Sequence, residues 1–373
     1  MADNFKYSSL FGELTRSVQL RFDAVTKLHK QLFDNVQYEK YLTWDLPTIG
    51  LNFEELKGKY NVTIAAATID HKSKEPILGT HGVDTIVGKI LDHSITLPMT
   101  IEDYRKILQI MDSKSLSDDA AKRQLIQLMW GSVQTPVKSV QAKIDILFLE
   151  ALSNEGVVVL NEENNPEGGV KTTIDYGMPA GNKASVTLDW LPVNADNINV
   201  FDDIQAMVDA AADKVVFEKI LLTPAKLSFI LRNTRLKTVI FGKDKNENPL
   251  LIQQLNEFMR MNELPYFETI RRECMIQDNG AFRPYNPWNG KNLVFVPAGK
   301  LGVIKNAYAN NELRQEQGVT YSNYGRIRVS QWGVGETQNS NGVEFVKAES
   351  MALPILTEIN GIYSLNTEPT PTG

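Results

Sequence analysis

Four histidines and a single cysteine are the residues of this sequence best suited to bind a metal or to transfer protons. No two histidines have the H-E-x-x-H spacing, and no histidine or cysteine lies among clustered acids at metal-ligand spacing. His71, His81 and His93 fall within one predicted ribbon, where a weak metal-binding or pH-sensitive cluster is one interpretation. Polar surface residues near a turn are the favoured alternative, and His29 lies apart from the other three in the sequence.

Cysteine and glycine give weak signals for catalysis or phosphate binding. Cys274 lies between Glu273 and Met275 in a strand-like run without a nearby histidine, so a buried and inert thiol is the favoured interpretation. The sequence contains no G-x-x-x-x-G-K-[ST] loop, and a bare G-x-G at Gly333 and Gly335 is a very weak phosphate-binding signal.

A group of basic residues is the remaining candidate for binding an anion. Such residues can line a pore or touch phosphates, but no aromatic residues interleave them as base stacking requires, so a solvated face is favoured. The sequence therefore predicts no catalytic, cofactor-binding or metal-binding residue and no cofactor, which favours a protein that is not an enzyme. The basic residues are Arg232, Arg235, Lys237, Lys243 and Lys245.

The composition is typical of a soluble globular protein. The chain has 373 residues, of which 42% are hydrophobic and 23% charged, and its net charge is −6. This balance lacks the basic footprint of a nucleic-acid-binding protein, although it suits a protein that lies beside nucleic acid without binding it tightly. No stretch is apolar enough to cross a membrane, and residues 1–6 begin no apolar signal core. One cysteine fits synthesis in a reducing cytoplasm.

A run of apolar and small residues from Asp118 to Asn154 predicts one long helix. The steps are mostly three and four residues, which places these side chains on one helical face. Asp118 or Ser117 can cap the start, and Gly156 suits the end because glycine adopts left-handed backbone angles. A helix of about 37 residues spans ~55 Å, longer than a small domain is wide. Gly131 and Pro136 predict a bend or break, so a core helix split at Pro136 is the alternative to a spine that backs several elements.

Two strand pairs flank this helix in the sequence. Val157–Leu160 is a short β-branched run, and Val170–Tyr176, whose residues alternate, is its predicted partner strand after a turn at Asn161–Gly169 that is rich in Asn, Glu, Pro and Gly. Before the helix, residues 61–100 form a predicted two-stranded ribbon whose charged tip is Asp70–Gly82. Two strands bury too little surface to be stable alone. The ribbon is therefore expected to lie on another surface, either within the chain or on a neighbouring subunit.

The first 41 residues are predicted to be mostly helical. An apolar stripe runs along them and basic residues occupy polar positions, without the dense basic face of a membrane-binding helix, so packing on protein is favoured. Leu46 and Pro47 break this pattern, and residues 44–50 are predicted to be an extended arm. The stripe consists of Leu14, Val18, Phe22, Val25, Leu28 and Leu32.

The rest of the chain mixes helices and strands without regular βαβ repetition, which predicts an α+β fold with two or three subdomains. Thr223 as N-cap and Pro224 at the first position predict a helix to about Arg232. Residues 239–241 are either a strand or the end of a helical turn. Further helices are expected at 101–111, 197–213 and 249–262, and strands at 219–222, 267–275, 293–296, 343–349 and 355–363.

Several short segments form a recognisable pattern when they are taken together in their order along the chain. They are 148–159, 173–179, Trp190, 223–233 and 347–363. In this order they resemble the major capsid protein family of lambda-type tailed bacteriophages, major capsid protein E. The helix that ends at Gly156, the strand pair and the segment Asp175-Tyr176-Gly177 follow one another in the same order as in the family. The resemblance covers about Tyr60 to Leu365, so the N-terminal helical extension lies outside it.

The resemblance implies a Hong Kong 97-like capsid fold with an N-arm, an E-loop, a peripheral domain and an axial domain. Residues near 157–176 and 343–363 would form the long β-sheet of the peripheral domain. Some relatives cross-link a ribbon lysine to an asparagine of the next subunit; Lys72, Lys74, Lys89 and Asn360 are present, but no matched motif supports that reaction. The implied parts are a helical N-terminal extension at 1–43, the N-arm at 44–60, the E-loop at 61–100, the peripheral domain at 101–196 with the spine helix at 118–154, the axial domain at 197–334, and a return to the peripheral domain with a C-terminal tail at 335–373.

The same resemblance implies a structural protein rather than an enzyme. Many copies would tile into hexamers and pentamers that close an icosahedral head around double-stranded DNA, which lies near the shell without specific binding. Scaffolding, portal and decoration proteins are further implied partners, a membrane is not, and the implied location is the virion after synthesis in the bacterial host cytoplasm. The alternatives are an encapsulin-like compartment shell, which shares the fold class, and a cytosolic α+β hydrolase whose site the motifs do not reveal.

Overall fold

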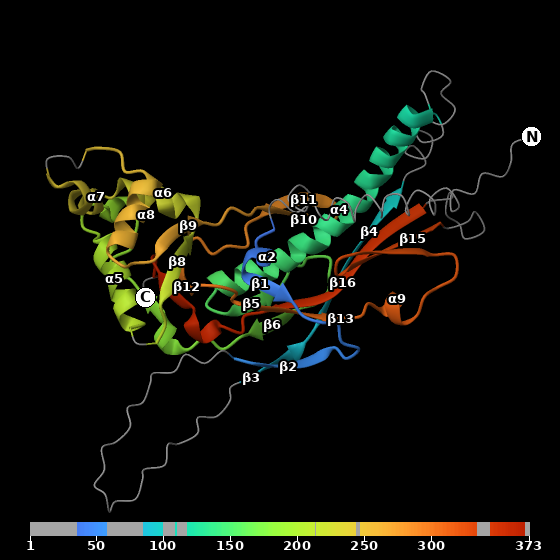
Figure 1. Ribbon diagram of the computed structural model, residues 1–373, viewed down its shortest axis with the longest axis horizontal. Coiled ribbons are helices and arrows are strands. Elements are labelled where there is room, and N and C mark those ends of the chain that lie inside the picture. Colours follow the sequence, from blue (N-terminus) through green and yellow to red (C-terminus); the bar gives the residue numbers. More distant parts are fainter. Residues whose placement is uncertain are drawn as a thin grey trace, which may run out of the picture.

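The computed structural model describes residues 36–57, 85–99, 109, 118–212, 214–243, 247–333 and 344–369. The molecule is elongated, with a group of helices at one end and a long helix that runs obliquely to the other end (Figure 1). The apolar stripe of the N-terminal extension and the ribbon tip Asp70–Gly82 lie outside the described residues, as does the predicted 101–111 helix apart from residue 109.

The long helix is α4, which spans Asp118–Ser153 as one element of 36 residues. It is not broken at Pro136: the helix continues through the proline, and Val137 and Val140 of the following turn are buried in the spine core, which offsets the loss of a helical hydrogen bond. The predicted end is confirmed, since Gly156 has φ 83° and its N–H donates to the Ala151 carbonyl at 2.9 Å. The chain therefore contains a spine and not a pair of short core helices.

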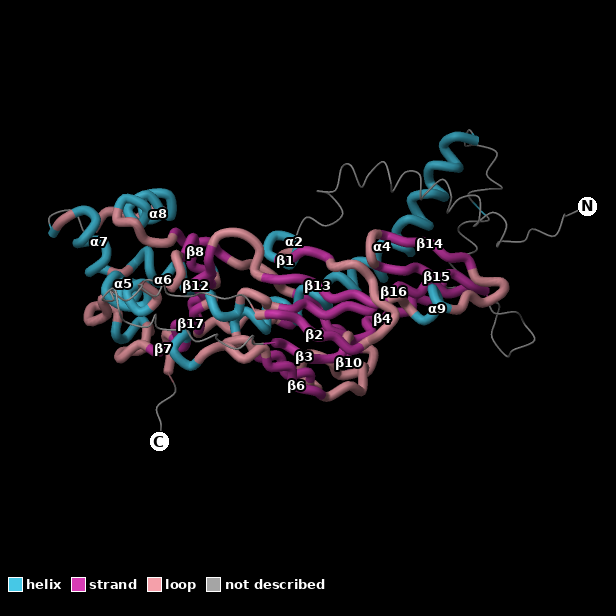
Figure 2. The backbone as a smooth tube through the Cα atoms, turned by 60° about the horizontal axis from the view of Figure 1, so that its bottom comes forward, coloured by secondary structure: helices cyan, strands magenta, loops and turns pink. Residues whose placement is uncertain are grey.

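A six-stranded sheet lies along one face of α4 (Figures 1 and 2). Its centre is β16, Glu344–Ile355, which pairs with β4, β13 and β15 in antiparallel register. The other strands are β1 (Leu42–Trp44), β4 (Leu91–Met99), β13 (Gly302–Ala307), β14 (Thr320–Tyr324) and β15 (Ile327–Gly333), with β1 parallel to β13.

A five-stranded sheet and four helices form the other end of the molecule. The strand order is β7-β17-β12-β8-β9, and the predicted cap of α6 is confirmed because the Thr223 hydroxyl accepts from the Lys226 N–H at 3.3 Å. The strands are β7 (Lys183–Ser185), β8 (Phe217–Leu222), β9 (Tyr266–Thr269), β12 (Asn292–Pro297) and β17 (Tyr363–Asn366). The helices are α5 (Val200–Ala210), α6 (Pro224–Arg232), α7 (Thr234–Phe241) and α8 (Ile252–Met261).

Three strand pairs and two short helices complete the strands and α-helices of the described part, which also contains the 3₁₀ turns Ala180–Asn182, Pro192–Asn194 and Ile359–Gly361. The pair β5–β6 joins Val157–Leu160 to Thr172–Asp175 and confirms the predicted hairpin after the spine. The pair β10–β11 joins Cys274–Asp278 to Ala281–Tyr285 through a turn at Asn279 and Gly280, both with positive φ, as a tight two-residue hairpin requires. The remaining elements are the pair β2 (Asn52–Leu56) and β3 (Thr85–Lys89) and the helices α2 (Tyr38–Tyr41) and α9 (Asn310–Leu313).

The buried apolar residues form two main clusters. The spine core lies between α4 and the six-stranded sheet, and the helical core lies between the five-stranded sheet and α5–α8. Strands β8 and β12 contribute to both, because alternate residues of a strand point to opposite faces. The two ends of the molecule are therefore joined through a shared sheet and not through a flexible linker.

The predicted ribbon differs from the structure in its pairing. Thr85–Lys89 pairs with Asn52–Leu56, which the resemblance assigned to the N-arm, while Leu91–Met99 leaves the ribbon and pairs with β16. The chain turns at Ile90, whose N–H donates to the Leu51 carbonyl at 2.7 Å. The twelve-residue β16 offers a long edge that satisfies the backbone of Leu91–Met99, which a pattern read within residues 61–100 does not reveal.

The late part of the chain also differs from the prediction. Residues 355–363 are not one strand: β16 ends at Ile355, a 3₁₀ turn occupies Ile359–Gly361, and the chain then joins the five-stranded sheet as β17. Leu356 and Ile359 are fully buried in the spine core, so this apolar run crosses between the cores. The predicted strand at 267–275 is divided into the two strands β9 and β10, and residues 239–241 form the end of helix α7. Strands β13–β15 fall within the implied axial range 197–334, but they belong to the six-stranded sheet.

Candidate assembly surfaces

The described residues contain no group of three or more His, Cys, Asp and Glu side chains that could hold a metal. None of the described helices combines the length and apolar character that a membrane crossing requires. His29, His71 and His81 lie outside the described residues, so the proposed histidine cluster is not tested there.

His93 is not a polar surface residue near a turn, as the favoured interpretation had it. It lies in β4, it is 7% exposed, and its Nε2 is 2.9 Å from the Ala352 carbonyl oxygen of β16. Burial, with a smaller contribution from the Lys143 charge, lowers the pKa of His93 to about 4. The side chain is therefore neutral at pH 7 and serves the packing of the sheet.

Cys274 and the basic residues fit their favoured interpretations. Cys274 is buried with Ile146 and Ile276, and burial raises the pKa of its thiol, which keeps it protonated and unreactive. Arg232 is exposed on α6, Arg235 is exposed on α7, and Lys243 is exposed just after α7. Lys237 of α7 is half-buried, and Lys245 lies outside the described residues.

Lys305 links the base of the ribbon to the six-stranded sheet, beside the packing of Leu51 and Phe53 on Ile90, Ala307 and Met351. Lys305 of β13 contacts Glu55 of β2, and its Nζ lies 2.6 Å from Asp45 Oδ2. Within the ribbon the Phe53 ring covers Gly88, where an added Cβ would lie 2.9 Å from Phe53 Cζ. The base is thus fixed in direction by a charge pair and by the close packing of Phe53 on Gly88.

The face of the ribbon opposite Phe53 and Glu55 presents apolar side chains to solvent. Leu56 is 60% exposed and Val87 is 70% exposed, although both are strand residues that usually pack on a neighbouring surface. Glu54 pairs with Val87 in the register of β2 and β3, and Leu56 pairs with Thr85. A ribbon that is clamped at its base and exposes Leu56 and Val87 on one face is suited to lie over another subunit.

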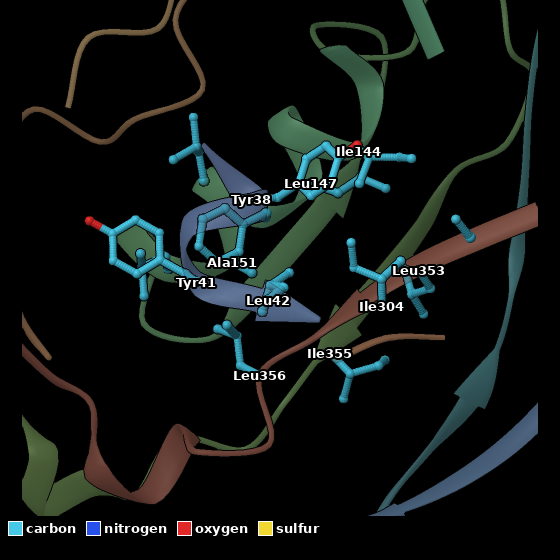
Figure 3. Packing of buried hydrophobic residues seen from close by; sticks show 14 of the residues in the cluster. Tyr38, Tyr41, Leu42, Ile144, Leu147, Ala151, Ile304, Leu353, Ile355 and Leu356 are labelled. Atoms are coloured by element: carbon cyan, nitrogen blue, oxygen red, sulfur yellow. The ribbon is translucent and has the colours of Figure 1, made fainter. Parts of the chain in front are cut away.

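The segment before the ribbon, residues 36–48, forms a strap across the spine core. Its α2 begins where Asp145 of α4, fully buried, accepts the N–H groups of Gln37 and Tyr38 at 2.8 to 3.0 Å, and Arg272 Nε lies 3.2 Å from Asp145 Oδ2. Burial raises the pKa of Asp145 to about 6, against the lowering effect of these partners. Figure 3 shows Tyr38, Tyr41 and Leu42 of the strap packed with Ile144, Leu147, Ala151, Ile304 and Leu353.

Two lysines and a backbone pairing extend the strap along the sheet. Lys300 Nζ donates to the Glu39 carbonyl at 2.6 Å and to the Leu42 carbonyl at 3.2 Å, which satisfies acceptors at the end of α2. Thr48 then bridges to Ala307 in parallel register, and Lys305 holds Asp45. Sequence reasoning did not identify these residues; the signal for Asp145 was an acid within the apolar run from Ile144 to Leu149.

A second polar node fixes the β5–β6 turn and the β10–β11 hairpin to the spine. Glu150 of α4 accepts from Asn164 Nδ2, 3.0 Å from each carboxylate oxygen, and from the Tyr285 hydroxyl. Lys143 Nζ donates to the Asn164 carbonyl at 2.7 Å, and burial lowers the pKa of Lys143 to about 8. Burial also raises the pKa of Glu150. The node therefore fixes the position of the turn and the hairpin, while the removal of its charged groups from water costs free energy.

Among solved structures, similarity extends over most of the chain at low identity. A prophage protein from Escherichia coli CFT073, described as a capsid protein, is 12% identical over 76% of this chain and 79% of the other, with a TM-score of 0.51. The capsid of Myoviridae phage XM1 is 7% identical over 88% and 90%, with a TM-score of 0.44. The SrpI encapsulin of Synechococcus elongatus is 9% identical over 88% and 85%, with a TM-score of 0.35.

These likenesses concern the fold alone, which is the Hong Kong 97-like phage capsid fold, and those with TM-scores below 0.5 carry no argument of their own. No curated protein matches the chain in sequence. The family model described as phage major capsid protein E matches residues 101–367, which include α4 and most strands of both sheets. The chain therefore belongs to the phage major capsid protein E family, and it is a structural major capsid protein.

Proposed function

We propose that many copies of this chain assemble into hexamers and pentamers that close an icosahedral phage head around double-stranded DNA. The observation that carries the proposal is the ribbon, which Lys305 clamps at its base and which exposes Leu56 and Val87. An apolar surface of this kind is stabilised when a neighbouring subunit covers it. The family assignment supports assembly into a capsid, and it favours a phage head over an encapsulin-like compartment.

The parts of the subunit take roles in this shell that combine the resemblance with the observed cores. The strap and residues 49–51 serve as the N-arm, and the ribbon from Asn52 to Lys89 serves as the E-loop. The unit around the spine core is the peripheral domain, and the unit around the helical core is the axial domain that surrounds capsomer centres. In this scheme β13–β15 belong to the peripheral domain and β17 to the axial one, because they follow the core in which their sheet lies.

The partners and location follow from this role. A scaffolding protein, a portal and decoration proteins are proposed partners of the shell. The packaged DNA lies near the shell without specific binding, because the chain is acidic, with a net charge of −6. The protein is made in the bacterial host cytoplasm and resides in the virion. No catalytic role is proposed.

Electron microscopy of the protein, expressed alone and together with its phage partners, tests the proposal. Closed shells with hexameric and pentameric capsomers are expected, and particles from infected cells should protect double-stranded DNA from nuclease. Shells that hold a protein cargo and no DNA would support the encapsulin-like alternative. A stable monomer or dimer under both conditions would contradict assembly and return attention to the hydrolase alternative.

A further inference from the structure

An amine, a carboxyl group and an amide meet where the β5–β6 turn packs on the spine. Lys143 and Glu150 are seven residues apart on α4, about two helical turns, so their side chains lie on the same helical face. Asn164 of the turn is 4% exposed and lies between them. Its Nδ2 contacts Glu150, and its main-chain carbonyl oxygen contacts Lys143. The three groups are therefore the reactants of a possible amide exchange.

The amide of Asn164 is held at both of its polar atoms. Its Oδ1 accepts from the Asn161 N–H at 3.0 Å, which polarises the carbonyl and would stabilise an oxyanion there. Its Nδ2 lies 3.0 Å from each carboxylate oxygen of Glu150 and donates to the Val159 carbonyl at 2.8 Å. The Tyr285 hydroxyl in turn donates to Glu150. The side-chain nitrogen of Asn164 is thus fixed at a group that can supply a proton.

Lys143 supplies a nucleophile at the same residue. Its Nζ lies 2.7 Å from the main-chain carbonyl oxygen of Asn164, and covalent geometry places that oxygen about 3–5 Å from Cγ of the side chain. The lysine stem is flexible, so a rotation of its last torsions brings Nζ to Cγ. Burial lowers the pKa of Lys143 to about 8 and raises the pKa of Glu150. Burial therefore favours the neutral amine, which can attack, and the protonated carboxyl, which can donate.

We propose that Lys143 and Asn164 form an isopeptide bond within one chain, with Glu150 as the proton carrier. The neutral amine of Lys143 attacks Cγ of Asn164, and the Cγ–Nδ2 bond breaks. Protonated Glu150 gives its proton to Nδ2, and its carboxylate then takes one proton from Nζ. Ammonia leaves, Glu150 returns to its starting state, and the atoms balance without another reactant. The chain modifies itself once, and the bond ties α4 to the β5–β6 turn.

Tryptic digestion of the full-length, unassembled chain tests the bond by mass spectrometry. Trypsin cleaves after a free Lys143 but not after an acylated one, so the bonded chain gives the single peptide 139–171, which contains both residues. Its mass should lie about 17 Da below the sequence mass, because ammonia is lost. Ring closure of Asn164 alone also loses ammonia but leaves Lys143 cleavable. Separate peptides 139–143 and 144–171, whatever their mass, would overturn the proposal, and so would a link between two chains.

Three variants assign the roles, with bond formation followed after cell-free synthesis. Lys143→Arg keeps the positive charge and the tryptic site but lacks the amine, so the bond should be absent. Glu150→Gln keeps the side-chain shape but cannot carry the proton, and it should slow bond formation at least about a hundredfold. Lys171→Arg, at an exposed lysine beside the same turn, is the matched control and should react at the wild-type rate.

A bond that forms in Lys143→Arg, or at the wild-type rate in Glu150→Gln, would overturn these assignments. The digest of the wild-type chain decides whether the bond exists, even if a variant fails to fold. Because the unassembled chain is used, the result is independent of shell formation.

Discussion

Ile220 and Leu221 are neighbours on β8, yet their side chains lie in different hydrophobic cores. Ile220 is fully buried in the helical core and Leu221 is fully buried in the spine core. The same division holds on β12, where Phe295 faces the helices and Val294 faces the spine. A change in either core is therefore transmitted to the other through strands that cannot move on one face alone.

This arrangement predicts that both units unfold together. Leu221→Ala removes side-chain atoms from a fully buried position and should cost about 2–5 kcal/mol of the free energy of unfolding. Hydrogen exchange measured on the unassembled subunit should show faster exchange both in α4 and in α5–α8. Val216→Ala, at an exposed position just before β8, is the matched control and should change little. Faster exchange confined to α4 would show that the units are energetically independent.

A second prediction concerns the lysine that clamps the ribbon. Lys305→Met keeps most of the side-chain volume but leaves the carboxylates of Asp45 and Glu55 without their shared cation. Hydrogen exchange in Asn52–Leu56 should rise by about fivefold, the factor for ~1 kcal/mol, and particle yield should fall because the ribbon loses its direction.

The control for this clamp is Lys171→Met, which removes the exposed ion pair with Glu162. Exposed pairs contribute little, so exchange and yield should stay at the wild-type level. If the Lys305 and Lys171 variants gave the same particle yield, the clamp would have no role in assembly.

The third prediction is a pH dependence of stability from His93. Its pKa is about 4 in the folded protein and ordinarily 6.5, so the unfolded chain binds a proton first as the pH falls. The stability contributed by neutral His93 is complete above pH 6.5 and is lost between pH 6.5 and 4, by roughly 3 kcal/mol. Denaturant unfolding of the subunit should show that His93→Gln narrows the difference in stability between pH 7 and pH 4.5.

Asp145 acts in the opposite direction and provides the control. Its pKa is raised from 3.8 to about 6, so the folded state keeps a proton that the unfolded state releases, and this contribution to stability decreases as the pH rises from 3.8 to 6. Asp145→Asn should therefore steepen the loss of stability on acidification, whereas His93→Gln reduces it. Parallel pH profiles for wild type and both variants would contradict these assignments.

Local signals in the sequence were sufficient for several elements. The spine and its end at Gly156, the cap Thr223 with Pro224, and the β5–β6 hairpin depend on residues near each other in the chain, and the structure confirms them. Long-range pairing was not predictable in this way. Leu91–Met99 is a strand in either arrangement, and only the edge of β16, more than 200 residues later, decides its partner.

The candidate surfaces show the same limit. Asp145 and Lys305 are ordinary acidic and basic residues in sequence, and their roles depend on Gln37, Tyr38, Asp45 and Glu55, which the fold brings to them. His93 reads as a surface residue because its neighbours Asp92 and Ser94 are polar, yet strand alternation places it under the sheet with Ala352. Burial shifts the pKa values of His93 and Asp145, and the burial of a side chain depends on the whole fold and not on its neighbours in the sequence.

The last prediction concerns the ribbon tip, Asp70–Gly82, which is charged and punctuated by glycine. Replacing it with Asn-Gly, which suits a tight hairpin, should leave β2–β3 pairing and the thermal unfolding of the unassembled subunit unchanged. Particle yield should nevertheless fall sharply, since the same interface repeats throughout a closed shell and a loss of ~1 kcal/mol changes each contact's equilibrium constant about fivefold. Normal particles from the shortened chain would rule out a role across subunits, and a loss of subunit stability would place the tip in the subunit's own core.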